Sequence, residues 1–251
     1  MDRRGSGEIN PLTASGQAPQ GGDRARSEAV PPSVLSLEKR RAAFLSRTEQ
    51  YLRLGHDRLA AAAFVASAGG GWAGKALDVG TGKGLLAVAL ARLGMEVWSV
   101  DMDRGETELA SYLAGREAFS GVIRFAVLDA GSLPFADGSF ERVASMDCLH
   151  HLLRPEEALQ EMARVLSDGG TLVLADFSPE GFDLVSRVHR AEGREHPVAG
   201  ISVRRATAFL EKAGLRAVGA AQAHLHEVSW MAKPPGNRVV PPAHGGGAGV
   251  R

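Results

Sequence analysis

The sequence predicts an α/β fold in which a doubly wound, mostly parallel sheet of seven strands carries helices on both faces, with extra helices at its N-terminal end. Three observations predict this fold. Short apolar segments alternate with segments of helical periodicity from residue 75 onward, which requires crossover connections between parallel strands. Residues 171–175 are nearly all apolar, as expected for a strand in the centre of a sheet that is covered on both faces. A glycine-rich turn at 80–84 joins the first strand to the next helix.

Two helices are predicted before the sheet. Ser36 is suited to cap the first helix, and Gly55 ends it. The second helix runs from Leu59 to Val65 and ends at the three glycines of 69–71. The predicted strands that follow lie at 75–79, 95–100, 122–128, 140–146, 171–175, 215–221 and 224–231.

The helices between these strands follow from apolar periodicity and from cap residues. Pro155 suits the first position of a helix, with Glu156 and Glu157 in its first turn, and Gly169 is predicted to cap that helix. The other helices are predicted at 83–93, 104–117 and 203–212.

These elements form one domain of about 200 residues between two ends that we expect to be disordered. Both ends, 1–33 and 233–251, are rich in glycine and proline and show no apolar period. The domain, 34–232, then comprises N-terminal helices at 34–70, a core at 75–178 and a C-terminal part at 179–232.

Composition narrows the possible partners. The 29 basic and 29 acidic residues cancel, which argues against a nucleic-acid partner held mainly through phosphates. The single cysteine, Cys148, cannot form an internal disulfide and fits a cytoplasmic location. No apolar run approaches the roughly 20 residues of a membrane span. Because Arg3-Arg4 is not followed by an apolar stretch, we expect no secretory signal.

The turn Gly80-Thr81-Gly82-Lys83-Gly84 is the first candidate ligand site, since ligands bind beyond the carboxyl ends of the strands in such sheets. Glycines let the backbone approach a ligand where a Cβ would intrude. A phosphate-binding Walker loop would need Ser or Thr after Lys83 and a glycine in place of Leu77. A dinucleotide fingerprint would need a small residue where Leu85 stands. A glycine turn without any ligand is the remaining alternative.

Acidic residues end the next two strands. Asp101 could accept hydrogen bonds from both hydroxyls of a ribose, with Met102 beside it against an adenine. Alone, an Asp at a strand end is usually a helix cap or a turn former. Asp129-Ala130 ends the third strand, and its carboxylate could accept a hydrogen bond from an adenine amino group. The alternative for Asp129 is an Asx-turn.

Together these motifs resemble those of class I S-adenosylmethionine-dependent methyltransferases, especially the type 11 branch that includes the quinone-ring C-methyltransferases. The resemblance covers about residues 70–178. It rests on Leu77-Asp78-Val79-Gly80-Thr81-Gly82-Lys83-Gly84, Asp101, Asp129-Ala130 with Leu133-Pro134-Phe135, Leu149-His150-His151 and Gly169-Gly170.

The resemblance implies a Rossmann-like fold, S-adenosyl-L-methionine as the cofactor and SN2 transfer of its methyl group. In that family the glycine loop backs the amino-acid part of the cofactor, the acid of the second strand holds the ribose, and the acid of the third strand meets the adenine. A general base is needed only if the acceptor must lose a proton. The cofactor-binding residues expected here are Asp78, Gly80, Thr81, Gly82, Asp101, Met102, Asp129, Ala130 and Met146.

Residues after the fourth and fifth strands are candidates for the acceptor side. His150 and His151 are the candidate catalytic residues, because one could orient or deprotonate an acceptor; alternatively, one packs and caps the helix at Pro155. Asp147 and Asp176 are comparable candidates, and a turn or cap role is the alternative for Asp176.

Two segments could cover the acceptor. The segment 177–202 is polar and follows the fifth strand. From the N-terminal helices, Tyr51, His56 and Arg58 could face the site, or they could belong to a packing layer across the edge of the sheet.

The other histidines raise the question of a metal. His189, His196, His224 and His226 could supply metal ligands, but we favour the interpretation that they are exposed polar loop residues and expect no metal site.

The sequence therefore favours a methyltransferase that acts on a small-molecule acceptor, with no nucleic-acid partner. Two alternatives stay open, a non-catalytic protein that binds S-adenosylmethionine or a partner on the same fold, and an NAD-dependent oxidoreductase.

Overall fold

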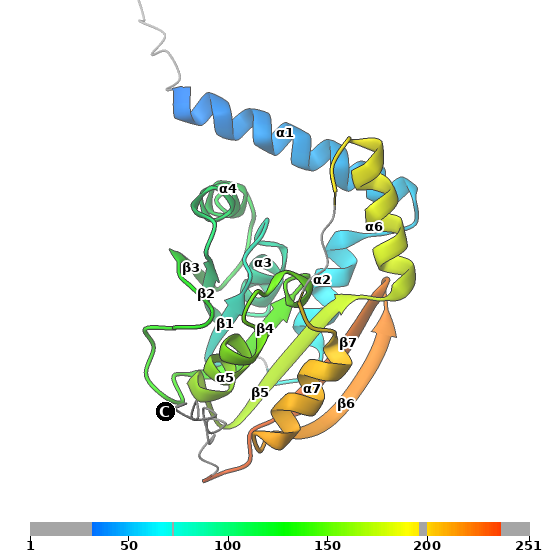
Figure 1. The fold of residues 1–251 in the computed structure, drawn as a ribbon. Coiled ribbons are helices and arrows are strands. Elements are labelled where there is room, and N and C mark those ends of the chain that lie inside the picture. The colour runs from blue at the N-terminus through cyan, green and yellow to red at the C-terminus, as the bar shows by residue number, and fades with distance from the viewer. Residues whose placement is uncertain (1–31, 72, 196–199, 237–251) are drawn as a thin grey trace, which may run out of the picture.

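The computed structural model describes residues 32–71, 73–195 and 200–236, and its centre is one seven-stranded sheet (Figure 1). The strand order is β3-β2-β1-β4-β5-β7-β6. Neighbours from β3 to β5 pair in parallel, whereas β7 pairs antiparallel with β5 and β6. The predicted mostly parallel sheet is thereby confirmed. Its strands are β1 (Lys75–Val79), β2 (Glu96–Asp101), β3 (Val122–Val127), β4 (Phe140–Met146), β5 (Leu166–Phe177), β6 (Arg216–Ala223) and β7 (His226–Ala232).

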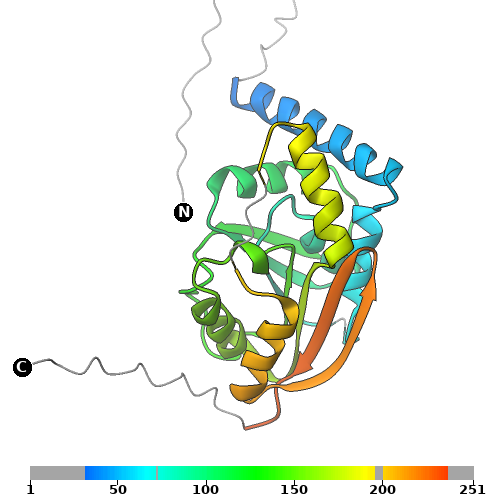
Figure 2. The same cartoon turned by 45° about the vertical axis from the view of Figure 1, so that its right-hand side comes forward.

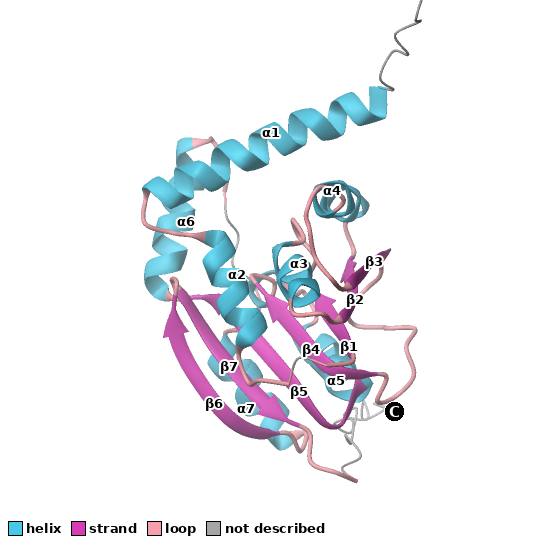
Figure 3. Ribbon diagram, turned by 180° about the vertical axis from the view of Figure 1, so that it is seen from behind, coloured by secondary structure: helices cyan, strands magenta, loops and turns pink. Residues whose placement is uncertain are grey.

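Helices cover both faces of the sheet (Figure 3). On one face lie α2 (Arg58–Ser67) and α3 (Leu85–Arg92), and on the other lie α5 (Pro155–Val165) and α7 (Val203–Lys212). Most of the predicted leader, residues 1–31, lies outside the described residues, as do 237–251 of the predicted tail.

The alternation of side chains along the strands divides the interior into two cores. Ala76 packs with α2 and α3, whereas its neighbour Leu77 packs with α5 and α7, because successive strand residues point to opposite faces. The same alternation puts Val173 in the first core and Leu172 in the second. All four side chains are fully buried, so both faces contribute to stability.

The longest helix, α1 (Pro32–Arg53), extends from α4 (Arg104–Ala114) to α6 (Pro179–Ala191), as Figures 1 and 2 show. Near its start, Glu38 accepts hydrogen bonds from Tyr112 and Arg116 of the α4 region. Toward its other end, Arg47 forms an ion pair of 2.9 Å with Glu192, directly after α6. Polar contacts therefore hold α1 at both ends. Within the described ranges, no helix is long and apolar enough to cross a membrane.

The region around Gly169 differs from the prediction. The helix that starts at Pro155 ends at Val165, and β5 begins at Leu166, so Gly169 lies inside a strand rather than at a helix cap. Leu166 pairs with Phe140 of β4, and the Gly169 N–H donates to the carbonyl of Lys233 at 2.8 Å. Residues from Leu166 to Gly169 thus belong to a sheet strand, although the sequence pattern there still predicts a helix.

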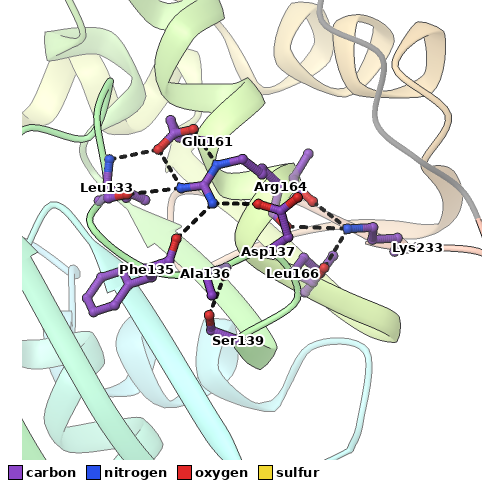
Figure 4. Close-up of polar contacts among 10 residues, drawn as sticks. Leu133, Phe135, Ala136, Asp137, Ser139, Glu161, Arg164, Leu166 and Lys233 are labelled. Atoms are coloured by element: carbon purple, nitrogen blue, oxygen red, sulfur yellow. Dashed lines mark hydrogen bonds and ion pairs between the residues drawn. The ribbon is translucent and has the colours of Figure 1, made fainter.

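Two cations, the partly buried Arg164 and the buried Lys233, fix the end of α5 (Figure 4). Arg164 donates to two carbonyls of the loop 133–137 and pairs with Glu161 at 2.6 Å. The ammonium of Lys233, 6% exposed, donates to the carbonyl of Leu166 at 2.6 Å and to the last carbonyls of α5. Helix ends leave such carbonyls without intrahelical partners. Lys233 therefore belongs to the folded domain and not, as predicted, to the tail.

Candidate active site

The glycine turn of the sequence leaves β1 at the edge where the parallel strands end. The N–H groups of Gly80 and Thr81 both donate to the carbonyl of Val100 in β2, at 2.9 and 3.1 Å. Gly80 has a φ of +90°, and a Cβ added there would lie 2.5 Å from the side chain of Cys148 beyond β4. Only glycine fits this position, because the turn needs both a left-handed residue and close contact with the chain that follows β4.

Asp78 is the innermost polar residue of the turn. It is 1% exposed, and its Oδ2 accepts a hydrogen bond of 2.8 Å from the hydroxyl of Ser99. The Ser99 oxygen lies 2.7 Å from the hydroxyl of Thr81. Burial raises the pKa of Asp78 to about 7, and the nearby Asp101 adds to the rise, although the Ser99 bond opposes it. The other oxygen, Oδ1, is buried without a hydrogen-bond partner in the described residues, so it can accept a bond from a ligand.

Asp101 holds the turn in place from the end of β2. Its Oδ2 accepts the N–H of Gly82 at 3.0 Å, and its Oδ1 accepts the N–H of Asp103 at 3.0 Å. An ionised carboxylate can accept about four hydrogen bonds, so each oxygen keeps one acceptor site. Asp101 can therefore support the turn and still bind a diol. Met102 beside it is 71% exposed.

Asp129, after β3, has partners of its own. Its Oδ1 accepts the N–H of Gly131 at 2.8 Å, which is the Asx-turn considered above. Its Oδ2 pairs with Arg154 at 2.6 Å, a partner that sequence reasoning missed. Ala130 is half-buried against the core, and Met146, at the end of β4, is 9% exposed in the core under α2 and α3.

His150 and Asp176 form a buried pair across the ends of β4 and β5. The Nδ1 of His150 lies 2.6 Å from Oδ1 of Asp176, and the backbone N–H of His150 donates to Oδ2 at 3.0 Å. The ring is 2% exposed. With Phe177 and Phe182, the pair lines a cavity of about 100 Å³. Because an ionised carboxylate only accepts, Nδ1 carries a proton, and in the neutral form of the ring the lone pair lies on Nε2.

The same contacts bear on the cap roles considered for His150, His151 and Asp176. Asp176 lies within β5 and contacts His150, whereas the N-cap of α6 is Ser178, so Asp176 does not cap α6. The N-cap of α5 is Arg154, and no side chain caps the N–H groups of this helix there, so neither histidine caps it. His151 is exposed, and its ring centre lies 3.9 Å from that of His150.

A second histidine–carboxylate pair joins β4 to β7. Nε2 of His226 lies 2.7 Å from Oδ1 of Asp147, and its Nδ1 lies 2.8 Å from the carbonyl of His224. Burial lowers the pKa of His226, but the hydrogen bond and charge of Asp147 outweigh it and the pKa is raised. Asp147 has a φ of +56°, which Asp tolerates better than most residues.

His226 corrects the prediction that the remaining histidines are exposed loop residues. It is fully buried at the start of β7 and faces Asp147. In the described part of the chain, no group of three or more histidine, cysteine or acidic residues could hold a metal ion. His196 lies outside the described residues.

The junction of α1 and α2 lies against this second pair. The ring of His56 stands 5.6 Å from that of His226 and 6.2 Å from that of Phe177. Tyr51 contacts His56 edge-on at 5.6 Å, and Arg58 lies over the Tyr51 ring at 5.5 Å. Tyr51 and His56 are buried, so they form a packing layer, which was one of the two alternatives. This layer lies against Phe177 at the end of β5 and His226 at the start of β7.

The sequence is similar to those of known proteins. Residues 77–174 match the family defined as the methyltransferase domain. The demethylmenaquinone methyltransferase of Deinococcus radiodurans is 33% identical over 181 residues, which are 71% of this chain and 73% of that protein. Methyltransferase GfsG of Streptomyces halstedii is 33% identical over 177 residues, or 66% of this chain, and the chain spans only 60% of GfsG.

The fold is shared with solved structures. One is a S-adenosylmethionine-dependent methyltransferase from Thermotoga maritima, described as a possible histamine N-methyltransferase. It superposes with a TM-score of 0.56 over 76% of this chain and 97% of that chain, at 18% identity. At this identity the likeness extends to the fold alone.

Proposed function

The chain belongs to the family of S-adenosylmethionine-dependent methyltransferases, and we propose that it transfers the methyl group of that cofactor to a small-molecule acceptor by direct SN2 displacement. Two relatives are named for small acceptors, demethylmenaquinone in Deinococcus radiodurans and 27-O-demethylrifamycin SV in Amycolatopsis mediterranei. The balanced charge of the chain supports a small acceptor rather than a nucleic acid. The single cysteine supports a cytoplasmic location.

The residues at the ends of β1 and β2 fit the cofactor. The unpartnered Oδ1 of Asp78 suits the ammonium of an amino acid, and open space lies beside the turn at Gly82, where an added Cβ would meet no protein atom within 4 Å. Asp101 has one acceptor site on each oxygen for the ribose hydroxyls. When bound, S-adenosylmethionine supplies a methyl group that its sulfonium sulfur activates. The chain then has mainly to position the acceptor and exclude water.

At the adenine end, Asp129 has one partner on each oxygen, Gly131 and Arg154. As with Asp101, each oxygen keeps one acceptor site. The Arg154 pair is about half exposed on both sides, and exposed ion pairs contribute at most about 1 kcal/mol, so this pair is also easily displaced. Asp129 could therefore accept a hydrogen bond from the adenine amino group. Met102 and Ala130 would pack beside the base, and Met146 would support it from below.

His150 is the proposed general base, and its bond to Asp176 is the observation that carries this proposal. Asp176 fixes the tautomer that presents Nε2 as the proton acceptor, and its charge stabilises the imidazolium that forms. The acceptor proton would pass to Nε2 as the acceptor attacks the methyl group. His151, exposed beside it, is assigned a lesser role in orienting the acceptor.

Incubation with methyl-labelled S-adenosylmethionine and a lysate of the source organism tests the function. Mass spectrometry of the extract is expected to reveal a labelled small molecule that is absent when the H150Q variant replaces the wild-type enzyme. Label that appears only in protein or RNA would contradict the proposed acceptor class.

A further inference from the structure

Arg58, the first residue of α2, is a cation without a counter-ion. In the described ranges its guanidinium makes no hydrogen bond, and no carboxylate lies within ion-pair distance of it. It lies instead over the rings of Phe44 and Tyr51, at 5.6 and 5.5 Å. Burial lowers the pKa of Arg58, because it disfavours the charged form. An anionic partner therefore stabilises a buried guanidinium more than it stabilises an exposed one.

Two neighbours of Arg58 also lack partners. His56 is 2% exposed, and its Nδ1 is buried without a hydrogen bond in the described residues. Burial and the charge of His226 lower the pKa of His56 to about 4, so its ring is neutral and one nitrogen carries a proton. Tyr51 is 4% exposed, and its hydroxyl makes no hydrogen bond within the described part of the chain. Three donors with unfilled bonding capacity thus gather at one junction.

The charges around this junction leave Arg58 without an ion pair in the described residues. Nδ1 of His226 must donate to the His224 carbonyl, so its Nε2 can bond an ionised Asp147 only as a second donor. His226 is therefore an imidazolium, and its pair with Asp147 is neutral overall, so that Asp147 is already engaged. Glu192 is engaged as well, because it pairs with both Arg47 and Arg194.

The junction lies on the acceptor side of the fold. His56 contacts Phe177 of β5 and His226 of β7, whereas the proposed cofactor ligands Asp78 and Asp101 stand at the ends of β1 and β2. Because β4 separates β1 from β5 in the sheet, a group held at His56 lies across β4 from the ribose.

We propose that Tyr51, His56 and Arg58 form a subsite that binds an anionic group of the acceptor, either a carboxylate or the oxygen of a phenolate or enolate. This proposal rests on the proposed methyltransferase function and narrows its substrate class. Arg58 supplies the charge, and Tyr51 and His56 donate hydrogen bonds to the same group. The subsite holds the acceptor on the β5 and β7 side. Phe177 links it to the base, because its ring lies 6.2 Å from that of His56 and 5.9 Å from that of His150.

A pair of matched probes tests the subsite. Benzoate and benzamide have nearly the same shape and differ in charge, and their affinities are measured by ligand-observed NMR on protein saturated with S-adenosylhomocysteine. The wild type is expected to prefer benzoate by about tenfold or more, since charged hydrogen bonds are the stronger ones. In R58M the preference is expected to fall to within about twofold. In Y51F, which keeps the ring, the preference for benzoate should fall by about threefold. R53M, at the exposed end of α1, is the control and should keep the full preference.

Each other outcome counts against a specific claim. If the wild type shows no preference for benzoate over benzamide, or if R58M keeps that preference, the proposed anionic subsite is overturned. A weaker affinity of R58M for S-adenosylhomocysteine, with the benzoate preference intact, would assign Arg58 to the cofactor carboxylate and also overturn it. Failure of the wild type to bind S-adenosylhomocysteine would instead count against the proposed function.

Discussion

His150 and Asp176 are joined twice, through the ring Nδ1 at 2.6 Å and through the backbone N–H of His150 at 3.0 Å. The two bonds use both oxygens of one carboxylate, so the ring and its backbone are fixed together. His226 and Asp147 are joined differently, because the second ring nitrogen of His226 faces a carbonyl. One pair can therefore accept a proton, whereas the other is a fixed ion pair.

The first prediction concerns this division of roles. H150Q should lower kcat by about 10²- to 10⁴-fold, the usual contribution of a general base, while the Kd for S-adenosylmethionine stays within about twofold. D176N should lower kcat as well, because it no longer fixes the tautomer. Steady-state kinetics and calorimetry check both values. H151Q is the matched control, and an equal loss in H150Q and H151Q would favour a packing role for His150.

The second prediction separates two glycines of the turn. A Cβ at Gly80 would collide with Cys148, whereas one at Gly82 meets no protein atom within 4 Å. G80A should therefore destabilise the ligand-free protein by about 2 kcal/mol or more, from overlap and a φ of +90°. G82A should cost only about 1 kcal/mol of stability but weaken cofactor binding more strongly. Urea unfolding and calorimetry give the two values. Equal stability losses in G80A and G82A would contradict this account of the turn.

The third prediction concerns Asp101. D101A should weaken binding of S-adenosylmethionine by about 1–3 kcal/mol, because it removes charge-assisted hydrogen bonds. D101N, which keeps one acceptor oxygen, should weaken binding of S-adenosylmethionine by less than D101A does. The control is D137A, an exposed residue far along the loop before β4, which should bind as the wild type does. Unchanged cofactor affinity in D101A would remove Asp101 from the site.

The fourth prediction is a pH dependence that Asp78 causes. Its pKa is about 7 in the folded protein and near 3.8 in the unfolded chain. Between these values the folded state binds more protons, so this residue lowers the free energy of unfolding as pH rises from 4 to 7. The 3-unit difference corresponds to about 4 kcal/mol. D78N, which cannot ionise, should therefore gain in stability relative to the wild type by about that amount across the same window. Parallel curves of unfolding free energy against pH for the two proteins would contradict the raised pKa.

The fold was largely predictable from the sequence, because apolar periodicity and turn residues agree along most of the chain. The predicted bounds of β1, β4 and α7 match the structure residue for residue. No helix was predicted within the polar segment 177–202 after β5, but half of this segment is α6 (Pro179–Ala191). Its start signals, a Ser178 cap followed by Pro179, were visible, and its apolar stripe faces α1.

The candidate site was predictable only in part. Contacts such as Gly82 with Asp101 follow from strand ends that must meet in a parallel sheet. The bond between His226 and Asp147 joins residues 79 positions apart, and it depends on β7 turning back antiparallel next to β5. Local patterns carry no information on such a pairing. The expected exposure of His226 was wrong for this reason.

Calorimetric titration of the purified protein with S-adenosylmethionine, S-adenosylhomocysteine and NAD tests the central claim most directly. We expect S-adenosylmethionine and S-adenosylhomocysteine to bind tightly, one molecule per protein, and NAD not to bind. Binding of NAD alone would contradict it.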